Sequence, residues 1–181
     1  MTVNGQSVLA PARPPVTPPV TPAGTSVALD EPDALREVFG CFATGVAVVT
    51  ATGPEGPAGM TVSAYTSLSI RPSLVLFCAA DESTTWPRIS RCGSFVINIL
   101  AHGQEDLAGA FARGHAHRFA GVRPSLSPAG LPVLPGILAY LECRIEQRWR
   151  GGDHTVVVGL VRHAERLRED APLLHFRGRL R

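Results

Sequence analysis

The sequence contains no lysine, so all 17 of its basic residues are arginines. This absence excludes Schiff-base chemistry and the lysine of a nucleotide-binding P-loop. Aromatic residues make up only 6% of the 181 residues, and the 15 acidic side chains leave a net charge of +2. A charge this small argues against a surface that follows nucleic-acid phosphates. We therefore expect no nucleic-acid partner.

Long apolar runs are also missing. No stretch reaches the length of about 18 residues that a membrane-spanning helix needs, and the longest, residues 74–80, has the length of a strand. The N-terminus lacks the basic and apolar segments of a secretory signal. The widely spaced Cys41, Cys78, Cys92 and Cys143 have apolar neighbours, which favours buried free thiols over disulfides. A cytoplasmic protein with no membrane partner is expected.

Several motifs of common enzymes do not occur. The sequence has no GxGxxG or GxxxxGK[ST] loop, no HExxH pair and no GxSxG elbow. His115 and His117 have no nearby cysteine or carboxylate to complete a metal shell. We therefore expect no metal site, no Rossmann or P-loop nucleotide site and no serine-hydrolase nucleophile.

Residues 1–30 differ in composition from the rest of the chain. Prolines at 11, 14, 15, 18, 19 and 22 alternate with Thr, Val and Ala. This composition favours an extended, solvated chain that buries little apolar surface. It predicts a disordered leader, with a docking arm for a partner as the alternative. Residues 31–181 are expected to form one domain, because about 150 residues suffice for a single core.

Hydrophobic periodicity and turn residues divide this domain into short elements. The first helix is expected to begin at Asp30 or Asp33 and to end before Gly45, because the apolar residues between them have helical spacing. Further helices are expected at 85–91 and 104–112, and strands at 46–52, 59–66, 74–80, 94–100, 141–149 and 155–162. Residues 113–136 show no clear period. The pattern predicts a mainly β fold, a β-barrel with a few short helices.

Residues 141–149 show the alternation of a half-buried strand. The apolar Leu141, Cys143 and Trp149 are expected to face inward, and the charged Glu142 and Arg144 outward.

Small hydroxyl residues gather at two expected strand ends. One group lies within residues 60–69, and the other, Ser83, Thr84 and Thr85, lies where a helix is expected to begin. Hydroxyl groups and free backbone N–H groups at such a place can bind a phosphate. The plainer alternative is that Ser83 or Thr84 only caps the helix.

A third candidate is His154, which follows Asp153 at a predicted hairpin tip. Histidine titrates near neutral pH, and a loop tip can present it to a ligand. A solvent-exposed turn histidine without a function is the alternative.

Several short segments, taken in order, resemble the flavin reductase family. They are FATGVAVVT (42–50), MTVSA (60–64), SLS (67–69), STT (83–85), FVINIL (95–100), RFAG (118–121), GLPVL (130–134) and GDH (152–154). Members of this family are small NAD(P)H:flavin oxidoreductases with an FMN-binding split β-barrel. The resemblance extends over roughly residues 34–178 and leaves out the proline-rich leader.

The resemblance implies a cofactor site. Its ring and ribityl contacts would be Thr61, Val62, Ser63, Ala64 and Ser67, and its phosphate contacts would be Ser83, Thr84 and Thr85. Arg118 and Phe119 stand at the family's basic–aromatic pair. Asp153 and His154 stand at the site of the nicotinamide nucleotide, with His154 as the candidate catalytic residue.

The implied reaction is hydride transfer from NADH or NADPH to FMN or FAD, which requires stacked rings rather than a triad or a metal. The implied partners are a second copy in a homodimer and a flavin-dependent monooxygenase that receives reduced flavin. A non-catalytic flavin carrier or sensor on the same barrel is one alternative, and a haem- or pyridoxal phosphate-binding relative is another. The choices between FMN and FAD and between NADH and NADPH stay open.

Overall fold

The computed structural model describes residues 24–112 and 118–181. Most of the expected leader, residues 1–23, lies outside the described residues, as do His115 and His117. The elements in chain order are α1 (Pro32–Phe39), β1 (Thr44–Gly45), β2 (Ala47–Gly53), β3 (Gly56–Val62), β4 (Tyr65–Ile70), β5 (Ser73–Ala80), α2 (Trp86–Cys92), β6 (Ser94–Ile99), α3 (Glu105–Ala112), β7 (Ser125–Leu126), β8 (Pro132–Val133), β9 (Ala139–Gly151), β10 (His154–Arg166), β11 (Leu174–Phe176) and β12 (Arg179–Leu180).

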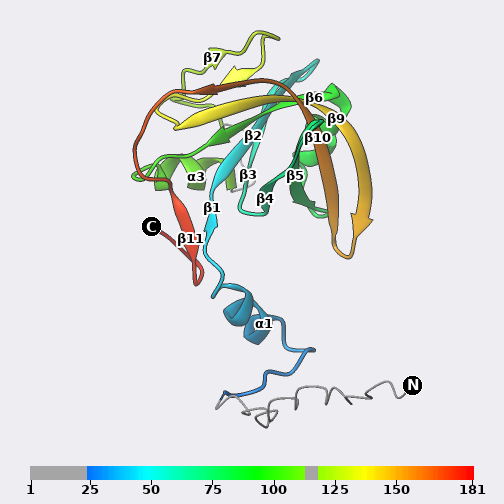
Figure 1. Ribbon diagram of the computed structural model, residues 1–181, viewed down its shortest axis with the longest axis vertical. Helices are drawn as coiled ribbons and strands as arrows, with labels where there is room; N and C mark the ends of the chain where they lie inside the picture. The colour runs from blue at the N-terminus through cyan, green and yellow to red at the C-terminus, as the bar shows by residue number, and fades with distance from the viewer. Residues whose placement is uncertain (1–23, 113–117) are drawn as a thin grey trace, which may run out of the picture.

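A seven-stranded antiparallel sheet forms the body of the protein. Its strand order is β3-β2-β6-β9-β10-β5-β4, and it curls so that β3 and β5 contact each other across the interior. The two edge strands, β3 and β4, form no ladder with each other within the described residues. Figure 1 shows the long, bent β9–β10 hairpin along one side and α3 on the opposite side. The mainly β fold expected from the sequence is confirmed.

Strands β2 and β6 of this sheet are buried on both faces. On β2, Val49 packs into the barrel interior with Phe77 and Phe95, whereas its neighbour Val48 packs on the outer face with Phe111 of α3. This follows from the two-residue period of a strand, which sends successive side chains to opposite faces. Apolar burial on both faces explains why 46–52 reads as a continuous β-branched run.

A buried polar network fixes the outer layer to the sheet. The Asn98 amide donates to the Val48 carbonyl and to Thr50 Oγ1, both at 3.0 Å, and its oxygen accepts from Leu134 N–H at 2.8 Å. Thr50 Oγ1 donates in turn to the Pro132 carbonyl at 2.6 Å. These bonds hold residues 132–134 against β2 and β6. They satisfy polar groups that would otherwise destabilise the core.

The first helix differs from the expectation. Its N-cap is Glu31 rather than Asp30 or Asp33, Pro32 occupies its first turn, and it ends at Gly40. Gly45 is instead part of β1, where it pairs with Leu174 of β11. The chain must extend before residue 45 to form this ladder, so the helix ends earlier. Figure 1 shows α1 lying away from the barrel.

The inward–outward assignment of residues 141–149 is wrong at two positions. Glu142 is buried and accepts hydrogen bonds from Ser127 Oγ at 2.6 Å and from Ala129 N–H at 2.9 Å. Trp149 has an exposed fraction of 47% because it lies where the β9–β10 hairpin extends beyond the core. The outer face of β9 is covered near Glu142 by the loop before β8, which alternation alone does not reveal. Leu141 and Cys143 do pack inside.

Other departures are local. The expected strand 59–66 breaks between β3 and β4, and short strands occur within 113–136 and near the C-terminus. The four cysteines are free, but Cys41 is exposed rather than buried. Burial raises the pKa of the Cys143 thiol to about 12. In the part of the chain that the structure describes, no helix is long and apolar enough to cross a membrane, and no cluster of metal-binding side chains occurs.

Candidate functional site

A cavity of about 390 Å³ opens where β3, α3 and the segment after β5 meet. Its volume falls in the range of roughly 300–1,000 Å³ that is typical of small-molecule sites. It brings together four residues that the sequence singled out: Thr61, Ser83, Thr84 and Arg118. We call this space the first cavity; its other lining residues are Met60, Ala80, Glu82, Phe111 and Ala112.

A second cavity of about 250 Å³ lies beside the first and shares Thr61 and Ala112 with it. Ser63, which follows β3, and His175 of β11 line this second cavity. The remaining lining residues are mostly small or aliphatic: Val46, Ala108, Gly109 and Leu180. The two cavities adjoin at Thr61 and Ala112, and we refer to them together as the groove: the first is lined by hydroxyl groups and an arginine, and the second is more apolar. The sequence analysis missed His175, which carried no motif of its own.

Ser83 contributes both to the start of α2 and to the first cavity. Its Oγ accepts a hydrogen bond at 3.1 Å from Trp86 N–H, the first of α2, although Thr85 rather than Ser83 or Thr84 is the N-cap residue; Ser83 also lines the first cavity. Pro87 within the first turn and Gly93 in the left-handed conformation bound this short helix. Thr85 is buried behind the loop and is absent from the lining of both cavities.

Thr61 is oriented by a hydrogen bond to α3. Its Oγ1 donates to the Ala108 carbonyl at 2.7 Å, so the side chain is fixed where the two cavities meet. The hydroxyl proton is used in this bond, which leaves the oxygen lone pairs for a ligand donor.

Arg118 extends along the free edge of β3. Its Nη1 donates to the Gly59 carbonyl at 2.6 Å, and burial, followed by the nearby Arg88 charge, lowers the pKa of its guanidinium. A guanidinium has five donors, so this bond leaves others for an anion. Phe119 does not line the cavities; it packs edge-on against Phe111 with ring centroids 5.0 Å apart.

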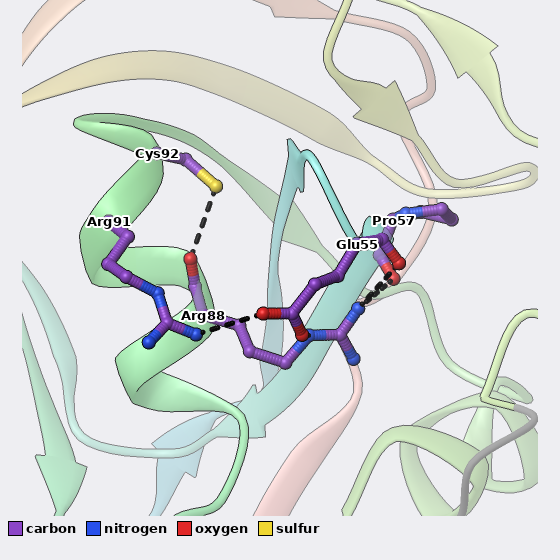
Figure 2. Close-up of polar contacts among 5 residues, drawn as sticks. All are labelled: Glu55, Pro57, Arg88, Arg91 and Cys92. Carbon is purple, nitrogen blue, oxygen red and sulfur yellow. Dashed lines mark hydrogen bonds and ion pairs between the residues drawn. The ribbon is translucent and has the colours of Figure 1, made fainter.

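Arg88 binds the same strand edge further along, as Figure 2 shows. Its Nη2 donates to the carbonyls of Glu55 (3.1 Å) and Pro57 (3.4 Å). Its Nε forms an ion pair with the Glu55 carboxylate at 3.1 Å, but the geometry is not that of a hydrogen bond. Arg91 forms an ion pair with the same carboxylate at 3.2 Å. These contacts join α2, which follows the Ser83–Thr84 loop, to the β2–β3 turn.

The β9–β10 turn brings His154 to the end of β5. His154 is the first residue of β10 and pairs with Ala80, which lines the first cavity. Its Nδ1 lies 2.7 Å from Asp153 Oδ1, and this hydrogen bond is the main reason why the Asp153 pKa is lowered. The imidazole is partly exposed and is absent from the lining of the first cavity itself.

Three further predicted residues lie outside the lining of both cavities. Val62 is buried in the barrel interior, because its side chain points opposite to that of Thr61 on β3. Ala64 is exposed, and its carbonyl accepts from Cys78 N–H at 3.0 Å. Ser67 is exposed on the edge strand β4.

The curled sheet with an open groove beside its edge is the architecture of a small-molecule-binding β-barrel. Comparison with known proteins identifies the family. Residues 39–181 match the family described as flavin reductase like domain. The chain therefore belongs to the flavin reductase-like family.

Individual relatives agree with this membership. The chain is 38% identical over 148 residues to the reductase subunit of a flavin-dependent monooxygenase from Rhodococcus jostii, covering 82% of this chain and 76% of the relative. It is 42% identical over 131 residues to an FMN reductase (NADH) from Agrobacterium fabrum, covering 72% and 75%. The NADH:FAD oxidoreductase of Streptomyces globisporus, solved with NAD and FAD fragments, has a TM-score of 0.83 at 37% identity, covering 87% of this chain and 96% of that one.

Proposed function

We propose that the protein is an NAD(P)H:flavin oxidoreductase that supplies reduced flavin to a partner monooxygenase. The observation that carries the proposal is the first cavity, which unites Thr61, Ser83, Thr84 and Arg118 from three separate parts of the chain. Relatives named as NADH-dependent FMN and FAD reductases support the reaction. The relative named as a monooxygenase reductase subunit supports the partner.

The residues present fit a flavin. The Ser83 and Thr84 hydroxyls and the Arg118 guanidinium supply hydrogen bonds and positive charge for a phosphate. The small residues of the second cavity, Ala108 and Gly109, leave space for a flat ring beside Ser63. We assign the phosphate of FMN, or the pyrophosphate of FAD, to the first cavity and the ring to the second cavity.

When bound, the flavin supplies the hydride acceptor, and NADH or NADPH supplies the hydride. The chain itself has to orient the two ring systems and does not have to relay a proton. His154 is assigned to hydrogen bonding with the nicotinamide nucleotide, through its carboxamide or its pyrophosphate. Asp153 holds Nδ1 of the imidazole, which directs Nε2 toward this ligand.

We also propose that two copies associate through α1. Within the described residues, the helix buries none of its own side chains, and the exposed fractions of Phe39 and Phe42 are 69% and 77%. These two large, exposed apolar side chains, one at the end of α1 and one three residues later, support an interaction site here. The free cysteines support the expected cytoplasmic location, because disulfides are rare in a reducing compartment.

The enzymatic proposal is tested by mixing the purified protein with FMN or FAD and with NADH or NADPH, and following nicotinamide absorbance. Flavin-dependent oxidation in at least one of the four combinations is expected. No oxidation in any of them would overturn the reaction. Tight co-purification of a flavin that stays oxidised would instead indicate the carrier or sensor.

The dimer is tested by light scattering after size exclusion. The full chain is expected to have twice the monomer mass, and the double variant Phe39→Glu/Phe42→Glu is expected to be monomeric. A monomeric wild-type protein would contradict the proposed dimer without affecting the proposed reaction.

A further inference from the structure

Asp81 lies between the first cavity and the hairpin turn that carries His154. Its chain neighbours, Ala80 and Glu82, both line the first cavity. Its own side chain points to β10 and the end of β9: Oδ1 accepts from Thr155 Oγ1 at 3.2 Å, and Oδ2 lies 3.6 Å from Arg150 Nε.

Asp81 forms hydrogen bonds with the two residues that flank His154 in the sequence. Asp81 N–H donates to the Asp153 carbonyl at 3.0 Å, and the Asp81 carboxylate binds Thr155. One backbone bond therefore holds the residue before His154, and one side-chain bond holds the residue after it. Two attachment points fix both the position and the direction of the intervening backbone.

This attachment is needed because the β5–β10 ladder ends at this position. His154 and Ala80 are its last pair, and the bond from Asp81 N–H to the Asp153 carbonyl follows it toward the turn. Terminal pairs and turn tips open most readily in a folded protein. Asp81 adds two bonds at the place where the ladder stops.

We propose that Asp81 is a positioning residue for His154. Its carboxylate fixes the backbone that presents the imidazole to the nicotinamide nucleotide. Because Ser83 follows Asp81 by two residues, the same segment also positions the Ser83–Thr84 loop. The inference rests on the proposed function and deepens it. Thr155 is the main contact, because Arg150 is largely exposed and exposed ion pairs contribute little.

The test compares Asp81→Ala, Asp81→Asn and Thr155→Val with a control, Glu146→Gln. Glu146 also belongs to the β9–β10 hairpin and forms an exposed ion pair with Arg144. Asp81→Ala is expected to raise the KM for the nicotinamide nucleotide about 5-fold with kcat within about 2-fold, because the orientation of a binding group is lost. Asp81→Asn keeps an acceptor for Thr155 and is expected to restore most of the loss. Thr155→Val is expected to act like Asp81→Ala, and Glu146→Gln like wild type.

A double variant separates positioning from general destabilisation. If Asp81 acts through His154, then Asp81→Ala raises KM no further in a His154→Ala background. Equal, additive increases in both backgrounds would overturn the proposal, as would a KM for Asp81→Ala equal to that of wild type.

A second measurement does not depend on activity. Hydrogen exchange at the amides of residues 153–156 is expected to accelerate about 10-fold or more in Asp81→Ala and not in Glu146→Gln. Unchanged exchange would refute the positioning role even in an active enzyme. If exchange is faster in Asp81→Ala but the wild-type protein oxidises neither NADH nor NADPH, the proposed function is refuted. The role of Asp81 in holding residues 153–155 would still be established.

Discussion

Ala80 stands opposite His154 at the final pair of the β5–β10 ladder, so a wall of the first cavity and the hairpin histidine are direct neighbours. Residues distant in sequence thus meet at one end of the barrel. The structure joins the hydroxyl loop after β5 to the GDH turn, which the sequence presents as unrelated segments.

Replacing His154 tests its assignment to the nicotinamide nucleotide. His154→Ala removes a hydrogen-bonding group without opening the core, because the side chain is partly exposed. We expect KM for NADH or NADPH to rise about 10-fold, the equivalent of one lost hydrogen bond of roughly 1.4 kcal/mol. Affinity for FMN should change little. Steady-state kinetics and fluorescence titration measure the two effects, and an unchanged KM would remove the role.

Arg118→Gln tests where the phosphate binds. Loss of the guanidinium should weaken FMN binding about 10-fold or more, since charge-assisted hydrogen bonds contribute roughly 1.5–3 kcal/mol. Riboflavin lacks the phosphate, so its affinity should stay nearly constant. Arg123→Gln is the control, because Arg123 is exposed and absent from the lining of the first cavity. Equal losses for FMN and riboflavin would place the phosphate elsewhere.

The Asp153–His154 hydrogen bond predicts a pH effect with a definite sign. The pKa of Asp153 in the folded protein is lowered, so its ionised form favours folding above the unfolded pKa. That contribution is lost as the pH falls through the lowered, folded-state value. His154→Ala should move the Asp153 pKa back toward its ordinary value. An NMR titration of the carboxyl carbon measures the change, and the same pKa in both proteins would contradict the interaction.

Two glycines permit close approach of aromatic rings. We expect alanine at both positions to reduce stability, but only one of the two substitutions to affect flavin binding. A Cβ on Gly59 would lie 2.6 Å from Phe111, which lines the first cavity, and one on Gly159 would lie 2.6 Å from the core residue Phe95. Each substitution should cost about 1–3 kcal/mol of stability. Only Gly59→Ala should also weaken flavin binding. Gly45→Ala meets no atom within 4 Å and serves as the control in thermal unfolding and flavin titration.

Asn98→Leu should destabilise the protein without touching either cavity. The substitution leaves Leu134 N–H without its buried acceptor and removes the donor to Val48, at a cost of about 2–4 kcal/mol. Urea unfolding measures the loss. A stability equal to that of wild type would mean that the network contributes nothing net.

The sequence predicts those features of the structure that depend on residues close together in the chain. The strand expected at 74–80 follows from a run of apolar residues, and the structure has it at Ser73–Ala80; the helix expected at 85–91 is found at Trp86–Cys92. Glu142 was assigned to solvent because alternation describes one strand at a time. Its burial depends on Ser127 from a distant loop.

The site shows the same division. Thr61, Ser83 and Thr84 belong to the hydroxyl groups that the sequence singles out, and Arg118 follows from the family resemblance; the structure brings all four to one cavity. Val62 shares a motif with Thr61 but points to the opposite face of β3. His175 could not be found from its neighbours in sequence, because β1–β11 pairing brings it to the groove.

Arg88 and Arg118 together donate hydrogen bonds to the carbonyls of Pro57 and Gly59 on the edge strand β3 and to that of Glu55 in the turn before it. An unprotected strand edge invites backbone pairing with another molecule. Arg118 therefore covers this strand edge at the same place where it lines the first cavity. A substitution that removes its guanidinium would uncover the Gly59 carbonyl and change the cavity wall together.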